Sequence, residues 1–380
     1  MSEIIPFKIA IEDAALDDLK QRLSNTRWPE AELVDDWSQG TPLEYLQDVC
    51  RYWANEYDWR RCEAEINQYP QFVTDVEGVD IHFLHIESPH ADAQPLVMTH
   101  GWPGSIVEFL KVIKPLTDPT AFGGDPRDAF HLVLPTMPGY GFSGKPSAPG
   151  WKIDRIGAAW TILMQRLGYP KYFAQGGDWG SAVTHSIAVT ETENCQGAHV
   201  NMALVSPSET LLTDLSELEK KAHAAIQHYL NWDSGYSKEQ STRPQTVGYG
   251  LVDSPAGLAG WILEKFWAWT DNNGHPEDTL SRDEMLDDIM FYWLTASGAS
   301  SARLYWESFN DALGPKAPIS LPFAYSCFPE DIFLSSQRWY AERCSDLRYY
   351  NVTDKGGHFA AMEQPELSVD EVRAAFRTMR

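Results

Sequence analysis

The sequence predicts an α/β fold in which a mostly parallel, eight-stranded sheet is covered by helices on both faces and carries a helical cap and an N-terminal extension. Short apolar segments typical of buried strands recur along the chain, with helical patterns between the later ones. A glycine-rich turn at 176–180 joins one of these strands directly to a helical stretch. The interval 206–318 is helix-rich and too long for a loop, so we expect it to form the cap.

The N-terminal extension is predicted to span residues 1–90. Leu16, Leu19 and Leu23 have the spacing of one face of an amphipathic helix. A second helix is expected to begin with a capping box, with Thr41 as N-cap and Glu44 at the third helical position.

The sheet and its helices are predicted to occupy residues 91–205 and 319–380, on either side of the cap at 206–318. Strands are expected at 72–76, 79–86, 96–99, 131–134, 171–175, 198–205, 321–328 and 347–352. Cap helices are expected within 211–230, 258–269 and 282–294.

The turn Gly176-Gly177-Asp178-Trp179-Gly180 has the small-x-nucleophile-x-small pattern of a nucleophile elbow, with an aspartate at its centre. An aspartate side chain, with an ordinary pKa of about 3.9, is ionised at neutral pH and needs no base before it attacks an electrophilic carbon. The competing interpretation is a glycine-rich turn whose Asp caps a helix.

The segment His100-Gly-Trp-Pro-Gly-Ser105 follows a predicted strand upstream of the elbow. In enzymes with this elbow, one backbone N–H of the oxyanion hole comes from the loop after that strand and the other from the residue after the nucleophile. Those residues are Trp102 and Trp179. We also expect a cis Trp102–Pro103 peptide, because the chain must turn sharply there.

A base and an acid are expected farther along the chain, in the order nucleophile, acid, histidine. His358 follows the predicted strand 347–352, and the pair Glu330-Asp331 follows the strand 321–328. Both places lie at carboxyl ends of strands, where sheet enzymes place catalytic groups. The two adjacent carboxylates compete for the role of the acid.

Together these motifs make the chain resemble the epoxide hydrolases of the α/β-hydrolase fold, in particular the microsomal and juvenile-hormone branch. The resemblance covers nearly the whole chain, and its motifs lie at 6–11, 26–29, 67–72, 100–105, 138–143, 176–181, 242–248, 253–259 and 356–361. It implies Asp178 as nucleophile, His358 as base and Asp331 as acid. Glu330 stays an alternative acid, because close relatives often carry Glu at that position.

The resemblance further implies that Tyr236 and Tyr305 open the ring by donating to the epoxide oxygen. The expected reaction converts a hydrophobic epoxide and water to a vicinal diol, with no metal and no organic cofactor. A haloalkane dehalogenase shares the fold, the Asp-Trp elbow and the histidine, and is the nearest alternative. A non-catalytic ligand-binding receptor on this fold is the alternative from another class.

Composition limits the partners. A net charge of −24 argues against binding to nucleic acid or to an anionic membrane, both of which require basic patches. Five scattered cysteines without a CxxC pattern, no signal peptide and no apolar run of 18 residues indicate a soluble, cytoplasmic protein without a membrane anchor. The sequence leaves open whether copies associate into a homo-oligomer. His82 and His85 would face opposite ways on a strand, so no metal site is expected there.

Overall fold

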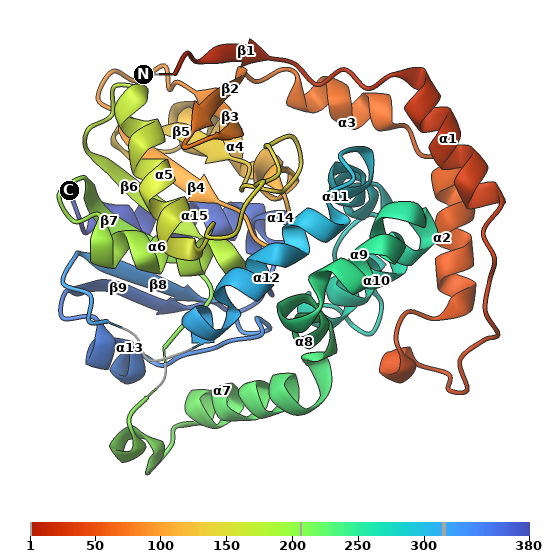
Figure 1. The fold of residues 1–380 in the computed structure, drawn as a ribbon. Coiled ribbons are helices and arrows are strands. Elements are labelled where there is room, and N and C mark those ends of the chain that lie inside the picture. The colour runs from red at the N-terminus through yellow and green to blue at the C-terminus, as the bar shows by residue number, and fades with distance from the viewer. Residues whose placement is uncertain (1, 206, 314–316) are drawn as a thin grey trace.

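The computed structural model describes residues 2–205, 207–313 and 317–380 (Figure 1). Its strands are β1 (Ile5–Phe7), β2 (Gln71–Val76), β3 (Val79–Ile86), β4 (Gln94–Thr99), β5 (Phe130–Pro135), β6 (Tyr172–Gly176), β7 (Cys195–Val200), β8 (Phe323–Cys327) and β9 (Leu347–Val352). They form one sheet in the order β1-β2-β3-β5-β4-β6-β7-β8-β9.

The predicted fold class is confirmed, with one more strand than expected. From β5 to β9 every neighbouring pair is parallel, whereas β1, β2, β3 and β5 pair antiparallel. The additional strand is β1, which pairs with β2 at the edge of the sheet. Three residues that include Pro6 show no period-two pattern, and proline is tolerated in sheets mainly at such edges.

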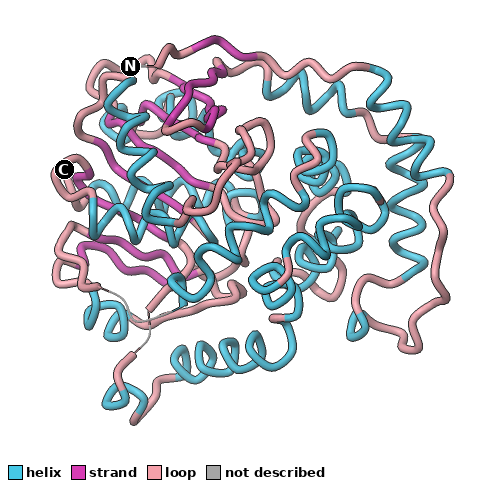
Figure 2. The backbone as a smooth tube through the Cα atoms, viewed as in Figure 1, coloured by secondary structure: helices cyan, strands magenta, loops and turns pink. Residues whose placement is uncertain are grey.

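Helices cover both faces of this sheet (Figure 2). The α-helices are α1 (Asp13–Ser24), α2 (Leu43–Asn55), α3 (Trp59–Ile66), α4 (Leu110–Thr117), α5 (Ile153–Arg166), α6 (Asp178–Thr190), α7 (Glu217–His228), α8 (Gly235–Thr242), α9 (Pro244–Asp253), α10 (Pro255–Trp269), α11 (Arg282–Leu294), α12 (Gly298–Leu313), α13 (Gln337–Arg343), α14 (Ala360–Glu363) and α15 (Pro365–Arg377). Helices α5 and α6 pack together on one face, and α4 and α15 pack together on the other. The strands between them are buried on both sides, which explains their continuous apolar runs.

In the chain, helices α7–α12 lie between β7 and β8, and they form the cap. The cap lies beside the carboxyl ends of the parallel strands (Figure 1). The N-terminal helices pack against it, because α1 and α2 contact α10 and α3 contacts α11. Buried polar contacts reinforce this packing: Asp287 of α11 accepts hydrogen bonds from the Tyr57 hydroxyl at 2.6 Å and the Arg61 guanidinium at 2.7 Å. The extension therefore braces the cap from outside.

Two local predictions were wrong. Helix α2 begins at Leu43 without the expected capping box: its first N–H donates to Glu32 Oε2 at 3.0 Å, and the Thr41 hydroxyl donates to the Gly260 carbonyl of α10 at 2.8 Å. The strand expected at 198–205 runs instead over Cys195–Val200. The chain leaves the sheet after Val200, and Met202 and Leu204 line the cavity described below.

No helix in the described part of the chain is long and apolar enough to cross a lipid bilayer.

Candidate active site

Asp178 lies on the sharp turn that joins β6 to α6. Its backbone has φ = 49°, a left-handed conformation that a non-glycine residue adopts only when its surroundings impose it. The turn also brings α6 very close to β4: a Cβ atom added to Gly180 would lie 1.9 Å from the Thr99 carbonyl oxygen. Strand, turn and helix thus form the strained elbow expected from the sequence, with the carboxylate presented at the end of the sheet.

The loop after β4 donates to one oxygen of this carboxylate. The Trp102 backbone N–H lies 2.7 Å from Asp178 Oδ1, and the predicted cis Trp102–Pro103 peptide is confirmed. Gly101 permits the approach, because a Cβ there would lie 2.2 Å from the Asp178 Cβ. Trp179, the other expected oxyanion-hole residue, follows Asp178 in the first turn of α6, where backbone N–H groups have no partner within the helix.

The other carboxylate oxygen faces a histidine. His358 Nε2 lies 3.2 Å from Asp178 Oδ2, and His358 Nδ1 lies 2.7 Å from Asp331 Oδ1. Burial acts to lower the pKa of His358, but the charge of Asp331 and the hydrogen bonds to Asp178 and Asp331 outweigh it and hold that pKa well above its usual value. The imidazole is therefore protonated at neutral pH.

The structure distinguishes the two candidate acids by position. The Asp331 side chain is fully buried against His358, and its Oδ1 also accepts the Ile332 N–H at 2.7 Å. Burial raises the pKa of Asp331, and the neighbouring His358 opposes that effect. Glu330 points elsewhere, pairing with Lys221 at 2.7 Å with 47% of its side chain exposed. Of the two, Asp331 is the carboxylate in contact with the histidine.

Two phenol groups from different cap helices meet above the carboxylate. Tyr236 of α8 and Tyr305 of α12 are both buried, and their hydroxyl oxygens lie 3.5 Å apart. The Tyr236 ring stacks on the Trp102 indole with centroids 4.9 Å apart, and the Tyr305 ring lies edge-on to the Trp179 indole at 4.8 Å. Burial raises the pKa of both phenols well above the usual value, so both keep their protons at neutral pH.

The cavity between cap and sheet is narrow, about 30 Å³, and mostly apolar. Besides Asp178 and the two tyrosines it is lined by Trp179, Ala182, Met202, Leu204, Tyr229, Phe309, Ala312, Ile332 and Phe333. One carboxylate group, two phenols and otherwise apolar walls suit a substrate with one polar reacting group on an apolar body.

Sequence reasoning missed two residues that the structure places at this site. The Tyr229 hydroxyl lies 3.3 Å from that of Tyr236, seven residues later and across the π-helical segment Tyr229–Asp233, and the spacing of the two tyrosines was the available signal. Glu363 accepts the backbone N–H groups of Gly357 and Phe359, on either side of His358, at 3.0 and 2.9 Å. No sequence motif indicates the second contact, because the acceptor lies five residues away in a separate short helix.

Comparison with known proteins agrees with this geometry. The family model described as epoxide hydrolase N terminus matches residues 4–109, and the one described as alpha/beta hydrolase fold matches residues 94–247. A putative epoxide hydrolase of Stigmatella aurantiaca is 53% identical over 99% of this chain and 86% of its own length. Epoxide hydrolase 1 of Sus scrofa is 36% identical over 97% of this chain and 88% of its own length.

Solved structures give the same result over the whole chain. The juvenile hormone epoxide hydrolase of the silkworm Bombyx mori superposes with a TM-score of 0.93 at 31% identity, covering 100% of this chain and 95% of that one. An epoxide hydrolase of Aspergillus niger superposes with a TM-score of 0.89 at 32% identity, covering 100% and 97%. Because sequence and fold both match these proteins over nearly the whole chain, the chain belongs to the epoxide hydrolase family of the α/β-hydrolase fold.

Proposed function

We propose that this protein hydrolyses a hydrophobic epoxide to a vicinal diol through a covalent ester of Asp178. The observation that carries the proposal is the different environment of the two carboxylate oxygens. Oδ1 accepts the Trp102 N–H at 2.7 Å, while Oδ2 lies 3.2 Å from His358. An oxygen held in an oxyanion hole becomes the ester carbonyl, so Oδ2 is the attacking atom.

In the first half-reaction, Asp178 Oδ2 attacks one epoxide carbon and the bond from that carbon to the ring oxygen breaks. The electron pair goes to the oxygen, which is strongly basic and takes a proton or a hydrogen bond as it leaves. Tyr236 and Tyr305 are the donors, since both hydroxyls are protonated and line the same cavity as Asp178. Two phenols held 3.5 Å apart also fix the position of the oxygen.

Ester formation prepares the second half-reaction. Esterification removes the Asp178 charge, which helps hold the pKa of His358 high, so that pKa falls. The imidazole then gives up its proton, which replaces the one that the phenol donated to the leaving oxygen. Neutral His358, oriented by Asp331, then takes a proton from water as the water oxygen attacks Asp178 Cγ. The oxyanion forms on Oδ1 at the Trp102 and Trp179 amides. Its collapse breaks the ester bond, the leaving oxygen takes the proton of the added hydroxyl to complete the diol, and the carboxylate is regenerated.

The substrate class follows from the cavity and from the relatives. The walls around Asp178 are apolar apart from the phenols. Relatives named juvenile hormone epoxide hydrolase, such as that of Ctenocephalides felis at 36% identity, support a hydrophobic epoxide. The phenol pair favours an epoxide over the halide leaving group of a dehalogenase, because a leaving alkoxide needs a proton and a halide does not.

A single-turnover experiment with styrene oxide in heavy-oxygen water tests the proposal. With enzyme in excess, the label is expected in Asp178 after one turnover, because water attacks the ester carbonyl and not the substrate carbon. In His358→Gln the ring should still open, and the intact mass of the protein should rise by the mass of one substrate. Label that enters the diol first, or a folded His358→Gln protein that never forms the adduct, would contradict the covalent route.

A further inference from the structure

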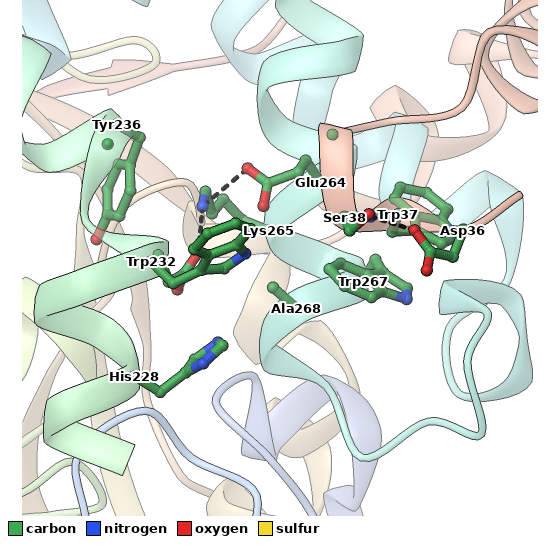
Figure 3. A pocket seen from close by; sticks show the side chains of 13 residues that line it. Asp36, Trp37, Ser38, His228, Trp232, Tyr236, Glu264, Lys265, Trp267 and Ala268 are labelled. Carbon is green, nitrogen blue, oxygen red and sulfur yellow. Dashed lines mark hydrogen bonds and ion pairs between the residues drawn. The ribbon is translucent and has the colours of Figure 1, made fainter. Parts of the chain in front are cut away.

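A buried lysine lies against one of the proposed ring-opening tyrosines. Lys265 of α10 is 2% exposed, and its Nζ lies 2.8 Å from Asp233 Oδ1 and 2.8 Å from Glu264 Oε2 (Figure 3). An ammonium group is rarely buried unless carboxylates pair with it. The two carboxylates therefore hold the Lys265 ammonium in a fixed position inside the protein. The reaction as described above does not use it.

The lysine lies over an aromatic ring. Its Nζ is 4.5 Å from the centroid of the Tyr236 ring and 5.3 Å from that of Trp269. Asp233 keeps this arrangement in place, because its second oxygen accepts the Trp269 indole N–H at 2.7 Å. A cation at this distance from a ring face is attracted by the electrons of the ring, and the attraction is larger where water is excluded.

That attraction must change during the reaction. As the Tyr236 hydroxyl gives its proton to the leaving oxygen, negative charge develops on the phenol and spreads into the ring. The ammonium is then bound more strongly than in the resting state. An interaction that strengthens only as the transition state forms raises the rate of that step.

We propose that Lys265 is a positioning residue for epoxide opening, with its ammonium placed over Tyr236 to stabilise the phenolate character that this ring acquires. The proposal rests on the function proposed above and adds a residue to its first half-reaction. Lys265 acts through the ring and not on the substrate. It lines a separate pocket of about 470 Å³, and among the described lining residues Tyr236 is common to that pocket and to the cavity of Asp178.

The test separates the two half-reactions in a rapid-quench single turnover with styrene oxide, followed by intact-mass analysis. In Lys265→Met, adduct formation on Asp178 is expected to slow by about 5- to 30-fold, the range of a desolvated cation–ring contact. Decay of the adduct should change by less than about twofold, since hydrolysis uses His358. Lys265→Arg, which keeps the cation, should restore most of the opening rate.

Glu264→Gln is the matched control. It removes one ion pair from the same cluster but leaves the ammonium over the ring, so opening should not slow. Equal slowing in Glu264→Gln and Lys265→Met would show a merely structural role and overturn the proposal. A normal opening rate in Lys265→Met would overturn it as well.

A second variant covers the case in which Lys265→Met fails to fold. Combining Lys265→Gln with Asp233→Asn leaves amide hydrogen bonds in place of the ion pair, and opening should slow to the same extent. The wild-type protein distinguishes this proposal from the function it rests on. If the wild type forms no adduct, the covalent mechanism fails; if it does and the lysine variants open the epoxide normally, the role of Lys265 fails.

Discussion

At the scale of single residues, the proposed catalytic groups lie on two sides of the Asp178 carboxylate. The proposed donors, Tyr236 and Tyr305, come from the cap and line the same cavity as Asp178. The proposed base, His358, lies on the loop after β9, and its Nε2 is 3.2 Å from Oδ2. Changes on the cap side should therefore affect opening of the epoxide, and changes on the sheet side should affect hydrolysis of the ester.

The tyrosine pair gives the prediction at this scale. Tyr236→Phe or Tyr305→Phe alone should slow formation of the adduct by about 10- to 1000-fold, because the other phenol still donates. Replacing both should nearly abolish alkylation of Asp178. Rapid-quench intact-mass measurements with styrene oxide report these rates directly.

Tyr325→Phe is a suitable control for that experiment. Tyr325 is as fully buried as the pair but belongs to β8, outside the residues that line the cavity of Asp178. Its loss should leave the rate of opening near that of the wild type. A double Tyr236, Tyr305 variant that alkylates at the normal rate would refute the assignment of the donors.

At the scale of elements, the loop that carries His358 is held by the helix that follows it. Glu363 of α14 accepts the N–H groups of Gly357 and Phe359, and also that of Asp271 at 2.8 Å beyond the end of α10. Burial raises the pKa of Glu363 to about 7, while the three N–H groups act in the opposite direction. One carboxylate thus joins the histidine loop to the cap.

Glu363→Gln is expected to slow hydrolysis of the ester more than opening of the epoxide. An amide places an NH₂ group where a carboxylate oxygen accepts N–H groups, so the His358 loop must shift. A shift of about 1 Å in a catalytic group can cost about 100-fold in rate. Slower decay of the Asp178 adduct, with its formation little changed, would show the effect. Glu366→Gln, at an exposed position in α15, is the control and should change the rate of neither step. If Glu363→Gln slowed opening and hydrolysis equally, the expected role of Glu363 would be contradicted.

At the scale of the whole molecule, the cap must stay packed against the sheet, because the two phenols belong to the cap and the carboxylate belongs to the elbow at the end of the sheet. Glu219 of α7 makes one of the connections. Its carboxylate pairs with Arg338 of α13 and accepts the Ser336 hydroxyl at 2.5 Å. Hydrogen bonds from Arg338 hold the pKa of Glu219 down to about 2, against the opposing effect of burial.

Glu219→Gln should lower the free energy of unfolding by about 1–2 kcal/mol at pH 7, at the low end for a charged hydrogen bond because Arg338 is 42% exposed. The pKa of Glu219 is lower in the folded state than its usual 4.5, so its contribution is full above that value and declines as the pH falls toward 2. Urea unfolding of both proteins at pH 7 and pH 3 should therefore show a smaller difference at pH 3. Glu217→Gln, whose carboxylate is 91% exposed, is the control, and a difference that grows with acidity would contradict the prediction.

Much of the site could be predicted from the sequence, because its geometry depends on residues that are adjacent in the chain. The turn around Asp178 needs small residues on both sides, and these are adjacent in the chain. The cis bond before Pro103 belongs to a single tight turn. Strand, turn and helix follow one another without insertion, so their order and the position of His358 after its strand could be predicted.

Contacts between distant segments could not be predicted in this way. The first N–H of α2 is satisfied by Glu32 across a loop, so Thr41 does not cap that helix. Asp331 and Glu330 are neighbours with equivalent chemistry, and the direction of the chain after β8 places one beside His358 and turns the other toward Lys221. Lys265 reaches the Tyr236 ring because α8 and α10 both pack against α9 in the cap. A motif records which residue types a turn requires, whereas burial, charge pairing and ring contacts depend on how separate elements pack, and that packing exists only in the folded chain.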